Sequence, residues 1–84
     1  MEKKVTNKLP SSLEARPIAM LVQVASKYES TIYLETAGKK VNAKSIMGMM
    51  SLQLKSGDEI NVIAEGADAS DAIEGIENYL SSVN

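Results

Sequence analysis

The residues able to do chemistry in this chain are few, because its 84 positions contain no cysteine and no histidine. Disulfides, thiolate nucleophiles and the usual zinc ligand sets are therefore excluded. The common acid/base group of neutral pH is missing as well. Two segments remain of interest: residues 13–17, which read Leu-Glu-Ala-Arg-Pro, and residues 42–52, in which Ser45 is followed by three methionines.

Ser45 stands directly before an apolar run that predicts a short helix over residues 45–54. In that position a serine is typical of an N-cap, whose side chain accepts a hydrogen bond from a backbone N–H two or three residues on. A phosphate on the same oxygen would meet the positive end of the helix, so modification need not disrupt the fold. Structural cap and modification site are compatible roles.

The methionines of this helix predict two faces. Met49 and Leu52 are three residues apart and can share the inward face, which leaves Ile46, Met47 and Met50 near the outward side. A methionine-rich helix can also simply fill gaps in a core. Three apolar side chains next to a serine favour a docking patch, since flexible thioethers adapt to partner surfaces.

Two charged residues lie at the start of an earlier helix, predicted over residues 16–28 with Pro17 in its first turn. Glu14 just before it is explained by the helix dipole, which stabilises an acid there by about 0.3–1 kcal/mol. Arg16 opposes the same dipole, so its presence favours a contact with a phosphate or an acidic partner. Lys39, Lys40 and Lys44 are typical of solvated surface.

The elements that position these residues follow from hydrophobic periodicity. Strands are predicted over 4–9, 31–35, a short stretch around Val41 and 59–65, and a last helix begins near Asp68. The turn 37–39 joins the second and third strands as a hairpin. The order β-α-β-β-α-β-α with half-polar strands predicts an α+β fold: one four-stranded antiparallel sheet with three helices on one face, as a single domain over residues 1–84.

The overall charge argues against some functions. A net charge of −2 and a sequence pI near 5.0 give no general affinity for nucleic acid or anionic membranes. A small RNA-binding α+β domain would share the element order, but this chain has three tyrosines and no Phe or Trp to stack on bases. No run approaches the roughly 20 apolar residues of a membrane span. A cytoplasmic location is expected.

Residues 13–17 resemble the active-site signature of the HPr phosphocarrier family, and residues 42–52 resemble the regulatory-site signature of HPr proteins from Gram-positive bacteria. The second match is long and specific. Residues 21–23 and 39–42 are similar to HPr as well, so the resemblance covers nearly the whole chain. It implies the open-faced β-sandwich of that family.

This chain departs from the family pattern at the position of the phosphorylated histidine. Glu14 stands where HPr proteins carry the phosphorylated histidine, Ser12 replaces the family glycine and Ile18 replaces the alanine after the proline. Within the family, loss of the histidine with retention of the serine marks a branch of HPr-like proteins that act in carbon catabolite repression. The resemblance therefore implies a regulatory protein that is not an enzyme and has no catalytic residue, cofactor or metal.

The same resemblance implies the partners. HPr kinase/phosphorylase would phosphorylate Ser45, and the modified chain would bind the catabolite control protein, a regulator of the lactose-repressor family, as its corepressor. Arg16, Ile46, Met47 and Met50 would contact that regulator, with no direct role for nucleic acid or membrane. A monomer and a homodimer are both compatible with the sequence. The alternative function is a phosphotransferase-system carrier that uses Glu14 as its phosphate acceptor.

Overall fold

The computed structural model describes residues 1–8, 15–52 and 57–81, with residues 15–17 described through their backbone alone. The strands are β1 (Glu2–Thr6), β2 (Thr31–Thr36), β3 (Lys39–Asn42) and β4 (Glu59–Glu65), and the helices are α1 (Ala15–Ser26), α2 (Ile46–Ser51) and α3 (Ala69–Leu80). This is the predicted element order. All strand pairs are antiparallel, in the spatial order β1-β4-β2-β3. The α+β fold is confirmed.

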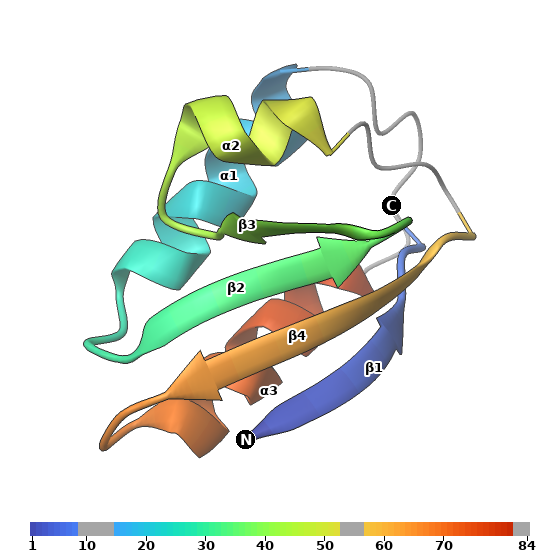
Figure 1. Ribbon diagram of the computed structural model, residues 1–84. Helices are drawn as coiled ribbons and strands as arrows, with labels where there is room; N and C mark the ends of the chain where they lie inside the picture. Colours follow the sequence, from blue (N-terminus) through green and yellow to red (C-terminus); the bar gives the residue numbers. More distant parts are fainter. Residues whose placement is uncertain (9–14, 53–56, 82–84) are drawn as a thin grey trace.

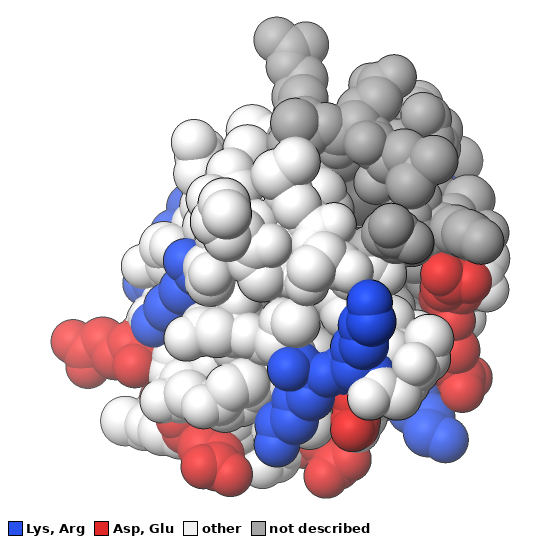
Figure 2. Space-filling view, turned by 45° about the horizontal axis from the view of Figure 1, so that its top comes forward, with Lys and Arg blue, Asp and Glu red and all other residues white. Residues whose placement is uncertain are grey.

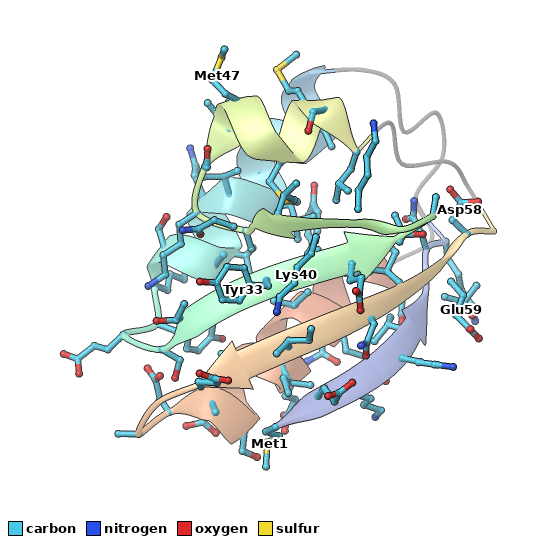
Figure 3. The ribbon with its side chains drawn as sticks, in the orientation of Figure 1. Met1, Tyr33, Lys40, Met47, Asp58 and Glu59 are labelled. Atoms are coloured by element: carbon cyan, nitrogen blue, oxygen red, sulfur yellow. The ribbon has the colours of Figure 1, made fainter. Side chains whose placement is uncertain are left out.

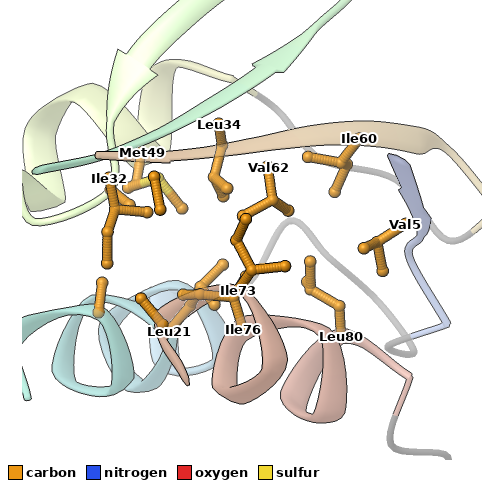
Figure 4. Close-up of a cluster of buried hydrophobic side chains, with 14 of the residues drawn as sticks. Val5, Leu21, Ile32, Leu34, Met49, Ile60, Val62, Ile73, Ile76 and Leu80 are labelled. Carbon is orange, nitrogen blue, oxygen red and sulfur yellow. The ribbon is translucent and has the colours of Figure 1, made fainter. Parts of the chain in front are cut away.

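Alternating side chains give the sheet one apolar face, which α1 and α3 cover (Figure 1). Leu34 of β2 lies opposite Val62 of β4, and Ile60 of β4 lies opposite Val5 of β1. All four side chains are buried, and they meet Leu21, Ile73, Ile76 and Leu80 from the two long helices (Figure 4). α2 lies along the β3 edge, in front of α1 in Figure 1, and adds Met49 and Leu52 to the same core.

The first strand lies earlier than predicted, over Glu2–Thr6 in place of 4–9. β4 is seven residues long, and its second half pairs with Glu2 and Lys3. After Thr6 the chain leaves the sheet. The amide of Asn7 donates to the carbonyl of Asp58 (2.8 Å) and the amide of Lys8 donates to the carbonyl of Leu80 (2.8 Å), at the end of α3. The predicted inward residue Leu9 falls outside the described residues.

The helix bounds also differ from the prediction. α1 ends at Ser26, two residues before the predicted end, because the amides of Lys27 and Tyr28 bond to carbonyls three residues back (Val24 and Ala25) and tighten the chain out of the helix. α2 ends at Ser51 with Leu52 as its C-cap. The predicted end of α2 at residue 54, like Val83 in the predicted stripe of α3, lies outside the described residues.

The hairpin between β2 and β3 is confirmed, with a loop of two residues, Ala37 and Gly38. Their φ angles are +52° and +80°. Positive φ at both positions is what a type I′ turn requires, and that turn matches the twist of the flanking strands. The hairpin places β3 at the sheet edge, and the chain continues from β3 into α2.

Candidate functional site

Ser45 is the N-cap of α2, as predicted. Its backbone is extended (φ −105°, ψ 111°), and its Oγ accepts a hydrogen bond from the amide of Gly48 at 3.2 Å. Its carbonyl accepts the first helical bond, from the amide of Met49 at 2.9 Å. The residue is half-buried, and its backbone is fixed by the helix.

The turn before Ser45 is held by Asn42, the last residue of β3. The side-chain oxygen of Asn42 accepts from the amide of Lys44 (2.8 Å), and its carbonyl accepts from the amide of Ser45 (3.0 Å). Side chains of this kind commonly bond to the backbone two residues on, which stabilises tight turns. The buried Ala43 donates its amide to the carbonyl of Ile32 in β2 (2.9 Å). Ser45 is therefore placed by the sheet as well as by its own helix.

The outward face of α2 is apolar. Relative exposure is 43% for Ile46, 79% for Met47 and 49% for Met50, against 0% for Met49 and 6% for Leu52. The predicted division of this helix into two faces is thus confirmed, and we call Ile46, Met47 and Met50 the α2 patch. Met47 points away from the body of the protein (Figure 3), and α2 itself contains no acidic or basic residue. Figure 2 shows an uncharged area with basic side chains at its border.

One exposed methionine was not singled out in the sequence. Met20 is 45% exposed and lies on α1, the helix against which α2 packs. The sequence does contain a signal for it. The inward positions of α1, which include the buried Ile18, Leu21 and Ala25, skip position 20, so helical spacing alone places Met20 outward.

The segment that resembles the phosphocarrier active site is described only in part. Glu14 lies outside the described residues. Arg16 lies in the first turn of α1, which begins at Ala15, and its side chain also falls outside the description. The structure therefore brings together Ser45 and the α2 patch, while the contacts of Glu14 and Arg16 stay predictions.

The three lysines near this site have different environments. Lys44 Nζ donates to the backbone carbonyl of Tyr28 at 2.6 Å, and the residue is half-buried. Lys39 Nζ donates to the carbonyl of Ser51 at 3.4 Å, and Lys40 Nζ lies 4.9 Å from the centre of the Tyr33 ring on the open face of the sheet (Figure 3). The prediction of solvated surface is wrong for Lys44, because the ammonium bonds to the carbonyl of Tyr28 in the turn after α1.

One electrostatic perturbation lies away from Ser45, at the start of α3. Asp68 at the start of α3 accepts hydrogen bonds from the Ser30 hydroxyl and from the amides of Glu29 and Ser30 (both 2.9 Å). The Ser30 hydroxyl and the Glu29 amide hold the pKa of Asp68 below its usual 3.8, because they stabilise the charged carboxylate. Burial raises the pKa of Tyr79. Both groups keep their ordinary charge at neutral pH.

Within residues 1–8, 15–52 and 57–81, no group of three or more acidic side chains is placed to hold a metal ion, and the chain has no His or Cys to contribute. Across the same ranges no helix is both long and apolar enough to cross a membrane. The site places a half-buried serine, on a hydrogen-bonded turn, beside an exposed apolar patch. Such an arrangement allows a covalent modification of the serine hydroxyl to be recognised by another protein.

Comparison with known proteins agrees with this description. The family model "PTS HPr component phosphorylation site" matches residues 1–82. The HPr-like protein Crh of Bacillus subtilis is 46% identical over 80 residues, which cover 95% of this chain and 94% of that protein. Crh of Halalkalibacterium halodurans is 51% identical over 80 residues, with 95% of each chain covered.

Solved structures of related proteins have the same fold as this chain. The phosphocarrier protein HPr of Bacillus anthracis superposes with a TM-score of 0.92 at 43% identity, over 96% of both chains. The crystal structure of Bacillus subtilis Crh, described as a swapped, intertwined dimer, has a TM-score of 0.79 at 45% identity, over 98% of this chain and 94% of that one. The match extends over both signature segments and the whole sheet, and on this evidence the chain belongs to the HPr family.

Proposed function

We propose that this chain is a regulatory, non-enzymatic HPr-like protein that acts in carbon catabolite repression in the cytoplasm. The observation that carries the proposal is a contrast within the chain: it has no histidine to carry phosphate, yet it keeps Ser45 at the surface beside an apolar patch. The similarity to Crh, whose name refers to catabolite repression, supports the same role.

In this proposal HPr kinase/phosphorylase adds and removes phosphate at Ser45. The hydroxyl accepts a hydrogen bond from Gly48 and lies on a turn fixed by Asn42, so the kinase meets a preformed target. Phosphorylation adds a charge of about −1.5 to −2 next to the α2 patch, whose three side chains are uncharged. The unmodified and modified forms then differ in charge at one defined point while sharing one fold.

The phosphorylated form then binds the catabolite control protein as corepressor. Basic groups of that regulator meet the phosphate through charge-assisted hydrogen bonds, and the α2 patch supplies apolar contact area. Met47 is the most exposed of the three patch residues and has the largest area to bury. Arg16, at the start of α1, is proposed to contact an acidic group of the same partner. A homodimer, as described for Bacillus subtilis Crh, is a proposed alternative assembly.

The test is incubation with HPr kinase/phosphorylase and ATP, followed by mass mapping of the phosphosite. We expect one phosphate, on Ser45, and none on the Ser45→Ala variant. That variant loses its N-cap bond and should be about 1 kcal/mol less stable, with an essentially unchanged circular dichroism spectrum.

Ser51 provides the matched control. It is an exposed serine on the same helix, and its hydroxyl donates to the carbonyl of Gly48 at 2.6 Å. Ser51→Ala should be labelled as fully as the wild type. Label that persists in Ser45→Ala, or that disappears in Ser51→Ala, would contradict the assignment of Ser45 as the sole target.

A further inference from the structure

The turn between α1 and β2, residues 27–30, is held from two sides by residues distant in the sequence. On one side, Lys44 Nζ donates to the carbonyl of Tyr28 at 2.6 Å. On the other, the carboxylate of Asp68 accepts from the amides of Glu29 and Ser30 at 2.9 Å and from the Ser30 hydroxyl. The turn thus connects the segment that leads into α2 with the start of α3.

Lys44 also adds a cation near the C-terminal end of α1, where Lys27 directly follows the helix. The last turn of α1 contains no basic residue. A cation near a helix C-terminus is stabilising because the unpaired carbonyls there carry partial negative charge. The ammonium of Lys44 lies at the chain end of α1, on the second carbonyl after Ser26.

The backbone of Lys44 is fixed while its side chain can move. The amide of Lys44 is bonded to the side chain of Asn42, and the next amide, of Ser45, is bonded to the carbonyl of the same residue. The ammonium, in contrast, sits at the end of a flexible four-carbon stem. A new acceptor near Lys44 can therefore draw the ammonium away without moving the turn that carries it.

Phosphorylation creates that acceptor at the adjacent residue. Lys44 and Ser45 share a peptide bond, so their Cα atoms lie about 3.8 Å apart. The bond to the Tyr28 carbonyl is already charge-assisted through the ammonium. A phosphate carries most of two negative charges, so it adds an attraction between opposite full charges that a neutral carbonyl lacks. A phosphate on Ser45 would therefore compete with the Tyr28 carbonyl for the Lys44 ammonium.

We propose that Lys44 is a regulatory contact: it holds the Tyr28 carbonyl while Ser45 is unmodified, and a phosphate on Ser45 takes its ammonium from that carbonyl. The inference rests on the proposed function only in taking Ser45 as phosphorylated. It makes the turn 27–30 a second place at which the two forms of the protein differ.

The change reaches α3 through the side chain of Tyr28. Its ring packs on Gly75, so closely that a Cβ added at Gly75 would overlap the tyrosine hydroxyl and lie 2.9 Å from Cζ. Tyr28, Asp71, Glu74, Gly75 and Asn78 line a hollow of about 330 Å³ on this side of the molecule. Release of the Tyr28 carbonyl loosens the support of a ring that lies directly against the third helix.

The Tyr28 carbonyl can be observed by itself in an NMR experiment, because of the residue that follows it. Tyr28-Glu29 is the only Tyr-Glu pair in the chain. Protein labelled with ¹³C in tyrosine carbonyls and ¹⁵N in glutamate therefore gives a single cross-peak in an HNCO spectrum, and that peak reports the carbonyl that Lys44 holds. Phosphoserine is inserted at position 45 during translation, so the measurement needs no kinase. Failure of the kinase to label Ser45 would contradict the proposed function and leave this measurement unaffected.

Four samples decide the question: unmodified protein, protein with phosphoserine at 45, Lys44→Met, and Lys44→Met with phosphoserine at 45. Loss of a hydrogen bond moves a carbonyl carbon upfield, so the second and third samples should both show an upfield Tyr28 peak. In the fourth sample the phosphate should add no further shift. Lys39→Met, which removes an ammonium that donates to a different carbonyl (Ser51), should leave the peak in place.

Three results would overturn the proposal. The peak could stay in place when phosphoserine is inserted, it could stay in place in Lys44→Met, or the phosphate could shift it just as far when Lys44 is methionine. The first would show that the ammonium keeps the carbonyl, the second that the bond is not formed, and the third that the phosphate acts by another route.

Discussion

Met47 and Met49 form a matched pair for testing the α2 patch, because they lie two residues apart on one six-residue helix with opposite exposure. Met47 is 79% exposed and Met49 is 0% exposed. Burying a whole methionine side chain contributes about 1.5–3 kcal/mol. About a fifth of Met47 is covered, so its truncation removes roughly 0.3–0.6 kcal/mol on that scale. The higher helix propensity of alanine offsets part of this loss.

Met49→Ala should behave very differently. Its side chain belongs to the core shared with the sheet, and truncation of a buried methionine costs about 2–5 kcal/mol, which includes the cavity left behind. Urea denaturation of both variants measures the two free energies of unfolding. We expect Met47→Ala within about 0.5 kcal/mol of the wild type and Met49→Ala well below it.

Met47 should matter for binding to the partner, although it matters little for stability. In a titration of the Ser45-phosphorylated protein with the catabolite control protein, Met47→Ala should weaken binding by about 1–2 kcal/mol, roughly five- to thirtyfold in Kd. Met47→Leu, which keeps an apolar side chain of similar size, should bind nearly as well as the wild type. A loss of 2 kcal/mol or more of stability in Met47→Ala would refute the surface assignment, and unchanged affinity would remove Met47 from the contact surface.

Three further predictions test other parts of the chain. If Glu14 only occupies the place of the lost histidine, Glu14→His should restore partial labelling from phosphoenolpyruvate through enzyme I; label on the wild type would show instead that the chain is a carrier. The pKa of Asp68 is lowered by folding, so its stabilisation is present above pH 3.8 and is lost as the pH falls through its folded value. Acid unfolding of Asp68→Asn should therefore lack that part of the pH dependence, and an unchanged acid limb would contradict the hydrogen bonds from Ser30. Alanine exceeds glycine by about 1 kcal/mol in helix propensity, yet Gly75→Ala should destabilise α3 because its Cβ meets the ring of Tyr28. In a Tyr28→Ala background the same change should become stabilising in urea denaturation, and the same sign in both backgrounds would exclude the clash.

The architecture was largely predictable because period-two alternation and helical spacing agree along the chain. Ile60, Val62 and Ala64 alternate in β4 and all are buried, as expected from their pattern. The position of β1 was less predictable. Glu2 and Lys3 pair with β4 although neither side chain is apolar. Backbone hydrogen bonds between neighbouring strands stabilise the pairing whatever the side chains are.

Contacts between segments distant in sequence cannot be predicted from the periodicity of the residues. Lys44 and Tyr28 are 16 residues apart, and Ser30 and Asp68 are 38 apart. A lysine on a turn looks the same in a sequence whether its ammonium is in water or on a carbonyl, since the partner is supplied by folding. The exposure of Met47 was predictable, in contrast, because helical spacing fixes it relative to the inward Met49.

The proposed regulatory site is built from one short segment, separate in sequence from the segment that resembles the phosphocarrier site. The hydrogen bonds that position Ser45 come from Asn42, Gly48 and Met49, all within one short segment. The backbone of that segment is anchored to β2 through Ala43. These contacts all come from residues 42–49, so in the proposed function a change at position 14 alters the phosphocarrier segment and leaves the residues that position Ser45 the same. Under the proposed function, one of the two segments can therefore change in sequence while the hydrogen bonds at Ser45 stay the same.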